Sequence, residues 1–134
     1  MMKGVFLIKK IITLCVVTIL TLILLSQFTK TNDTPININL INKVNAMDHR
    51  WVNYKGISEN NKAMMQSQFI PYNPEKDYEV SGDTYVSYFN GEDFIKTELY
   101  EDTPEIINTV EEADGVILSF NKDNKNGIKL VTTD

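Results

Sequence analysis

The pattern of apolar and polar positions divides the chain into two parts. Residues 11–28 form a nearly unbroken apolar run, whereas the sequence after residue 36 alternates short apolar segments with turn-forming residues. At about 1.5 Å per residue, a helix over this run would span roughly 27 Å, close to the hydrocarbon thickness of a bilayer. We therefore predict one transmembrane helix, because a core helix that is apolar on all sides needs a larger domain to cover it.

Basic residues flank this run unequally. Lys3, Lys9 and Lys10 precede it, and Lys30 follows it. Positive charge tends to stay in the cytoplasm, so the rest of the chain is predicted to lie outside the membrane. The predicted organisation is a cytoplasmic basic N-terminus at 1–10, a transmembrane signal anchor at 11–28, a linker at 29–36 and an extracytoplasmic domain at 37–134.

A secretory signal peptide has the same basic start and apolar centre, so secretion after cleavage is the alternative. The residues directly after the run lack the small pair that signal peptidase needs. The best match, Val44-Asn45-Ala46, lies far from the run, and cleavage there would remove the first predicted strand of the domain. A lipoprotein signal does not fit, because Cys15 follows Leu14 and lies inside the run. We interpret the segment as an uncleaved anchor.

The clearest strand signal lies at residues 84–95. Asn90-Gly91 tolerates positive φ at both central positions of a type I′ turn, and β-favouring residues flank it, so a hairpin is predicted. Residues 116–120 alternate with Val116, Leu118 and Phe120 on one face, which predicts a core strand.

Further short apolar segments are bounded by turn residues. They lie at 51–54, 64–70, 78–80 and 128–132. Residues 104–110 fit a strand or one helical turn, since Pro104 also suits the first position of a helix. About seven short strands without a long amphipathic helix predict an all-β domain, an antiparallel, jelly-roll-like β-sandwich.

Composition limits the classes of function. The hundred or so residues after the apolar run suffice for one domain with a modest core. Cys15 is the single cysteine, so the domain has no disulfide and no thiolate metal site. From residue 37 onward there are nine Lys or Arg and seventeen Asp or Glu, a formal charge of −8. Such a surface repels phosphate backbones, so nucleic-acid binding is disfavoured.

The sequence gives little support for a catalytic site or a metal site. His49 is the single histidine, and no motif presents a nucleophile to it, so we predict no enzyme activity. Residues 121–127 contain several oxygen donors, but Lys125 stands where a calcium loop needs an acceptor. This segment is interpreted as a solvated hairpin turn. No metal and no cofactor are predicted.

The order of several segments resembles a β-sandwich module of bacterial and phage surface proteins, often found ahead of SGNH-type hydrolase domains or in phage tail proteins. The segments are NLINK at 39–43, NYKG at 53–56, SQFIPYNP at 67–74, DYEVSG at 77–82, YFNGEDFI at 88–95 and ADGVILS at 113–119. This resemblance implies a carbohydrate-binding or spacer module. The chain departs from the pattern near Ile117, where such modules tend to carry an arginine.

Aromatic residues supply the candidate ligand site. Exposed aromatic faces can stack on sugar rings beside polar groups, whereas most aromatics of a small sandwich serve its core. Trp51 and Tyr54, with Asp48 and Arg50 near them in sequence, are the predicted ligand-binding residues. The functional hypothesis is a membrane-anchored, non-catalytic module that binds cell-wall or surface glycan. The alternatives are a protein-interaction or assembly module, and an accessory domain of an SGNH-type esterase or acetyltransferase.

Overall fold

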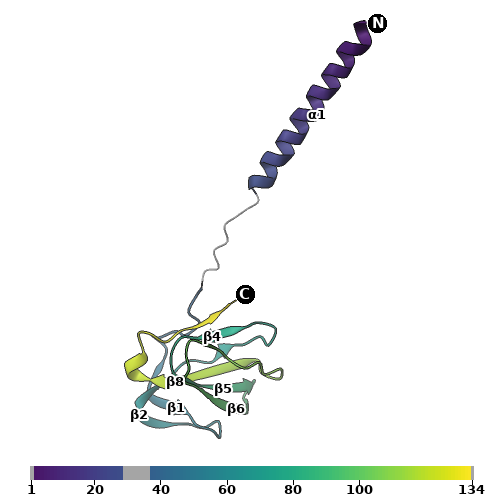
Figure 1. Ribbon diagram of the computed structural model, residues 1–134. Helices are drawn as coiled ribbons and strands as arrows, with labels where there is room; N and C mark the ends of the chain where they lie inside the picture. Colours follow the sequence, from purple (N-terminus) through teal and green to yellow (C-terminus); the bar gives the residue numbers. More distant parts are fainter. Residues whose placement is uncertain (1, 29–36, 134) are drawn as a thin grey trace. The chain divides into compact units, whose positions relative to one another are not determined.

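The computed structural model describes residues 2–28 and 37–133, so the predicted linker at 29–36 lies outside the described residues (Figure 1). The chain divides into two compact units, Met1–Ile36 and Asn37–Asp134. Among the described residues, the first unit contains a single helix and the second contains all the strands.

Helix α1 spans Met2–Phe28, so it begins nine residues before the apolar run and includes the basic N-terminal residues. Its stretch Lys3–Thr21 is long and apolar enough to cross a membrane, and none of it is buried against the protein. Thr13, Thr18 and Thr21 each donate their hydroxyl to a backbone carbonyl one turn earlier, at 2.8–3.1 Å. These bonds satisfy the hydroxyls within the helix, which lowers the cost of placing them in lipid.

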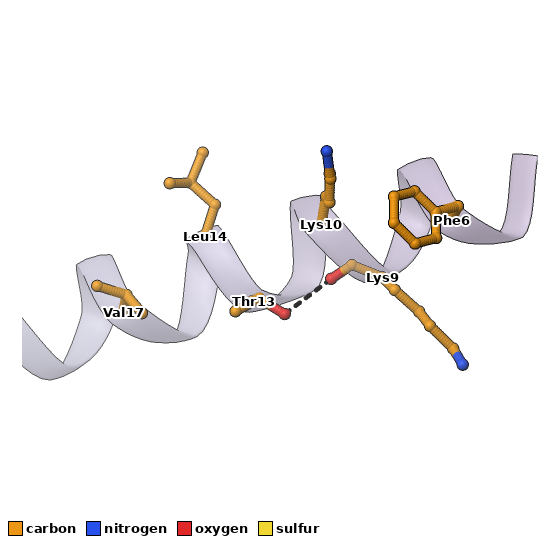
Figure 2. Close-up of a pocket in the computed structure, with 6 residues that line it drawn as sticks. All are labelled: Phe6, Lys9, Lys10, Thr13, Leu14 and Val17. Carbon is orange, nitrogen blue, oxygen red and sulfur yellow. Dashed lines mark hydrogen bonds between the residues drawn. The ribbon is translucent and has the colours of Figure 1, made fainter. Parts of the chain in front are cut away.

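A shallow hollow lies along one part of α1. Figure 2 shows its lining side chains, which are Phe6, Lys9, Lys10, Thr13, Leu14 and Val17. The Lys10 ammonium lies 5.1 Å from the centre of the Phe6 ring, and Thr13 bonds to the Lys9 carbonyl. All six residues belong to one exposed helix, so the hollow is part of a surface suited to lipid, and we do not treat it as a ligand site.

The second unit consists of two antiparallel sheets. This confirms the predicted all-β domain. The larger sheet has the order β1-β2-β8-β5-β6, with β3 also pairing with β8, and the smaller has the order β7-β4-β9. The strands of the larger sheet are β1 (Met47–Val52), β2 (Ser58–Gln66), β3 (Ile70–Pro71), β5 (Thr84–Asn90), β6 (Asp93–Tyr100) and β8 (Gly115–Asn121). Those of the smaller sheet are β4 (Tyr78–Val80), β7 (Glu105–Ile106) and β9 (Leu130–Thr132).

The main core is built from residues of both sheets. Along β8, Val116, Leu118 and Phe120 are fully buried, which confirms the predicted alternation. Val86 and Tyr88 of β5 belong to the same cluster, as do Tyr78, Val80 and Leu130 of the smaller sheet. Ile41 also lies in this core, and the Leu40 amide donates to the Leu130 carbonyl at 2.8 Å. Cleavage after Ala46 would therefore remove a core residue.

At one end of the larger sheet, the hairpin of β1 and β2 folds over the strands β8, β5 and β6, on the face that points away from the main core. Its register changes abruptly, because Asp48 pairs with Met65 but Arg50 pairs with Asn60. Beyond this irregularity, the Val52 amide donates to Ser119 Oγ of β8 at 2.9 Å. On the same face, Thr97 Oγ1 of β6 donates to the Asn53 carbonyl at 3.2 Å and lies 2.7 Å from Ser87 Oγ.

Two turn predictions are corrected by the structure. The hairpin of β5 and β6 exists, but Asn90 pairs with Asp93, so Gly91 and Glu92 form the centre of the turn. Gly91, at the first central position, has φ 57°, and Glu92, at the second, does not have a positive φ, which fits a type II′ turn and not the predicted type I′ turn. A bulge between Tyr88 and Phe89 moves the register.

Residues 121–127 do not form a hairpin turn. The chain passes through a short 3-10 helix, η1 (Lys122–Asn124), and then leaves the larger sheet. Strand β9 pairs with β4 of the smaller sheet, so β8 and β9 belong to different sheets. For residues 104–110 the sequence fitted a strand or a helical turn. The structure has a two-residue strand there, β7.

Candidate aromatic binding face

Three aromatic rings, two from the segment at 51–54 and one from β5, meet on the β1–β2 side of the domain. Trp51 and Tyr85 have ring centres 5.2 Å apart, Tyr54 and Tyr85 5.9 Å, and Trp51 and Tyr54 6.4 Å. All three contacts are edge-to-face, which suits the ring quadrupoles. Tyr54 is 58% exposed, and Trp51 and Tyr85 are half-buried. We call Trp51, Tyr54 and Tyr85 the aromatic trio.

A tight turn positions Tyr54. The Asn53 side-chain oxygen accepts from the amides of Lys55 at 2.8 Å and Ile57 at 3.1 Å, and the Asn53 amide donates to the Ile57 carbonyl. Gly56 has φ 76°, and a Cβ on it would lie 2.3 Å from Cγ of Phe94. The turn therefore packs closely on β6, which only glycine allows at this position.

Glu59 fixes the polar edge of the trio. Its carboxylate accepts from Trp51 Nε1 at 3.0 Å and from the Asn53 side-chain amide at 3.1 Å. One acidic residue thus holds both the indole and the turn, and its orientation is set by two hydrogen bonds. A rigid aromatic surface loses little conformational entropy when it binds a ligand.

A small groove adjoins the trio at Tyr85. Its volume is about 190 Å³, and its other lining side chains include Met64, Leu99, Asp83, Glu101 and Asn121. Leu99, which pairs with Tyr85 across β5 and β6, is 40% exposed. An apolar floor with polar groups at its edge is the usual composition of a small-molecule site.

The predicted site residues divide between this face and another surface. Trp51 and Tyr54 belong to the trio. Asp48 instead lines a separate hollow of about 460 Å³ with Lys43, Lys122 and Asp123, while Arg50 is exposed on β1. The register change at His49, whose φ is 59°, separates Asp48 from the segment that carries Trp51.

His49 lies on β1 beside Asp48. Its ring is 53% exposed, and its Nε2 lies 3.8 Å from the Asp48 carboxylate. Within residues 2–28 and 37–133, no group of three or more His, Cys, Asp or Glu side chains could hold a metal ion.

A second polar cluster lies at the edge of the main core, where Glu98 and Lys96 are half-buried and Asn108 is exposed. Glu98 accepts from Lys96 Nζ at 2.8 Å, from the Tyr100 hydroxyl at 2.7 Å and from Asn108 Nδ2 at 3.1 Å. Burial favours the neutral acid, but these three bonds outweigh it, so the pKa of Glu98 is lowered. Burial raises the pKa of Tyr100 to about 12. Because Asn108 belongs to the loop after β7, we assign this cluster to holding that loop on the sheet.

Sequence reasoning missed Tyr85 as a site residue. The available signal was its position in β5, since it alternates with Val86 and Tyr88, which the pattern places in the core. What the pattern could not supply was the folding of β1 over this face, which brings Trp51 to Tyr85.

Comparison of the chain with protein-family models, with curated proteins and with solved structures gave no match. The resemblance to a carbohydrate-binding-like module therefore stays a prediction.

Proposed function

We propose that the chain is a membrane-anchored binding module. In this proposal α1 anchors it, the domain at 37–134 is a jelly-roll-like β-sandwich outside the membrane, and the aromatic trio binds cell-wall or surface glycan without transforming it. The exposed apolar helix supports the anchor, and the basic residues at its start support an outward domain. The core shared by the two sheets supports the sandwich.

The arrangement of the aromatic trio carries the proposal. An isolated tyrosine on a surface is ordinary. A group of three rings in mutual contact, held by Glu59 and by the Gly56 turn, exposes apolar surface at a cost in free energy, and such a patch is typical of a binding site. Such rings present flat apolar faces to the C–H faces of sugars. The exposed Asn53–Ile57 turn places backbone and side-chain polar groups beside them.

Binding is tested with the full chain in detergent micelles. We expect it to be retained on purified cell-wall glycan, and we expect the double variant Trp51→Ala/Tyr54→Ala to lose most of that retention. Ile106→Ala is the matched control, because Ile106 is a similarly exposed apolar residue, 45% accessible, on the smaller sheet. Equal retention of the double variant and the wild type would exclude the trio as the binding face.

The side of the membrane needs its own experiment. Protease added outside intact cells is expected to digest residues 37–134 while the helix stays in the membrane fraction. Protection of the domain until the membrane is opened would contradict the proposed topology. Recovery of the domain from the medium would favour the cleaved-signal alternative.

Protein interaction is the second candidate, and the observation that favours it is the outer edge of β6. Within the described residues, β6 pairs with β5 alone, so its other edge could accept a strand from a partner. Its charged residues Asp93, Lys96 and Glu98, and the bulge opposite them, are features that protect edges from pairing. A crosslinked protein partner recovered after complete glycan digestion would support this candidate over the first.

A further inference from the structure

The charged side chains that line the groove beside Tyr85 are all acidic. Asp83 and Glu101 are its charged lining residues, and both are exposed; no lysine, arginine or histidine lines it. Asp83 is held near Thr103, whose hydroxyl donates to its carboxylate at 3.2 Å. Lys55, in the turn beside Tyr54, is not among the lining residues.

We propose that this groove makes the aromatic face select glycans that carry free amino groups, such as glucosamine-containing polymers. The inference rests on the proposed glycan binding and deepens it by naming the sugar class. The trio binds the sugar faces, and the groove receives the ammonium group of a neighbouring sugar. Glycans rich in carboxylate or phosphate are excluded by the same charges.

The physical reason has two parts. An ammonium in the groove would share it with the side chains of Asp83, Glu101 and Tyr85, so ion pairing with the carboxylates and attraction to the ring would act together. An acetylated amine has no charge and gains neither contribution. The hydrophobic contact with the trio is the same for both sugars, so the preference comes from the groove alone.

The size of the groove also fits this role. At about 190 Å³ it is smaller than the 300–1,000 Å³ typical of pockets that enclose a whole drug-sized ligand. It can therefore take one polar substituent or sugar edge, while the rest of a polymer lies on the open trio. Asn121 adds a polar group at the rim, where its Oδ1 accepts from the Asp123 amide and its side-chain nitrogen faces no partner in the described residues.

Calorimetry on the full chain in micelles at pH 6 tests the inference with three hexamers: glucosamine, N-acetylglucosamine and galacturonate. We expect the glucosamine hexamer to bind about tenfold more tightly than the acetylated one, and the galacturonate hexamer to bind weakest. The double variant Asp83→Asn/Glu101→Gln should lose the tenfold preference and keep binding to the acetylated hexamer. Glu75→Gln/Glu112→Gln changes two exposed carboxylates elsewhere and should keep the preference.

The outcomes separate this inference from the proposed function. Equal binding of the amino and acetylated hexamers, lost in Trp51→Ala/Tyr54→Ala, would overturn the inference and leave glycan binding intact. Failure of all three hexamers, and of cell-wall glycan, would overturn both. Pentalysine that binds as tightly as the glucosamine hexamer, and does not need Trp51, would assign the groove to cationic peptides and overturn the inference as well.

Discussion

The hydroxyl oxygens of Tyr88 and Tyr100 lie 3.0 Å apart in the buried region between β5, β6 and the loop after β7. Tyr88 also contacts the Asn108 carbonyl at 3.0 Å, and Tyr100 also contacts Glu98 at 2.7 Å and accepts from the Asn108 amide at 2.9 Å. Two hydroxyl protons thus serve three oxygen–oxygen contacts. The two tyrosines do not contribute equally, because Tyr100 alone joins the loop amide to the carboxylate.

We predict that Tyr100→Phe lowers the free energy of unfolding by about 2–3 kcal/mol and Tyr88→Phe by about 1 kcal/mol. The first change leaves the Asn108 amide without its acceptor and takes a donor from Glu98. The second takes one donor from the Asn108 carbonyl and leaves the Tyr100 bond to Glu98 in place. Urea unfolding of the full chain in micelles measures both, and a larger loss for Tyr88→Phe would contradict this account.

We expect Glu98 to make the stability of the domain depend on pH. Its pKa in the folded protein is below the ordinary value, because the bonds from Lys96, Tyr100 and Asn108 outweigh burial. Its contribution is therefore present above the unfolded pKa, about 4.3, and is lost as the pH falls through the folded pKa. Glu98→Gln should be less stable than wild type by about 1–2 kcal/mol at pH 7, and the difference should shrink between pH 5 and pH 3. Unfolding curves at several pH values test this, and a constant difference would assign the loss to packing alone.

Gly56 and Gly91 provide a matched pair for testing how the trio is held. Both have positive φ, but a Cβ on Gly91 meets nothing within 4 Å, whereas one on Gly56 meets Phe94. Gly91→Ala should cost only the conformational strain, about 1–2 kcal/mol. Gly56→Ala should cost a further 1–3 kcal/mol or so, from overpacking, and should weaken glycan retention by moving Tyr54. Equal losses in the two variants would show that the turn does not depend on its packing against Phe94.

Much of the strand pattern could be predicted because it depends on neighbouring residues. The alternation of Val116, Leu118 and Phe120 follows from the period of a strand, and the hairpin of β5 and β6 follows from its glycine turn. The turn is centred one residue later than predicted, and a bulge between Tyr88 and Phe89 shifts the pairing next to it by one residue. A bulge is decided by packing across the sheet, which local sequence does not report.

The candidate site was predicted only in part for the same reason. Trp51 and Tyr54 lie three positions apart, so their proximity followed from the sequence. Tyr85 joins them through a contact across about thirty residues, and Asp48 is separated from them by a change of pairing between two adjacent strands. Both facts depend on how β1 folds over the larger sheet.

The helix gives the last prediction, which concerns membrane retention. Val16 is exposed near the middle of α1 and lies inside both the sequence-predicted span and the stretch Lys3–Thr21. An arginine at the centre of a transmembrane helix costs about 2.5–3.5 kcal/mol, so Val16→Arg should move a large share of the chain from the membrane fraction to the soluble fraction. Lys9→Arg keeps the charge at the helix start and should change nothing. Carbonate extraction followed by blotting measures the partition, and full retention of Val16→Arg would mean that the helix is held by something other than its apolar surface.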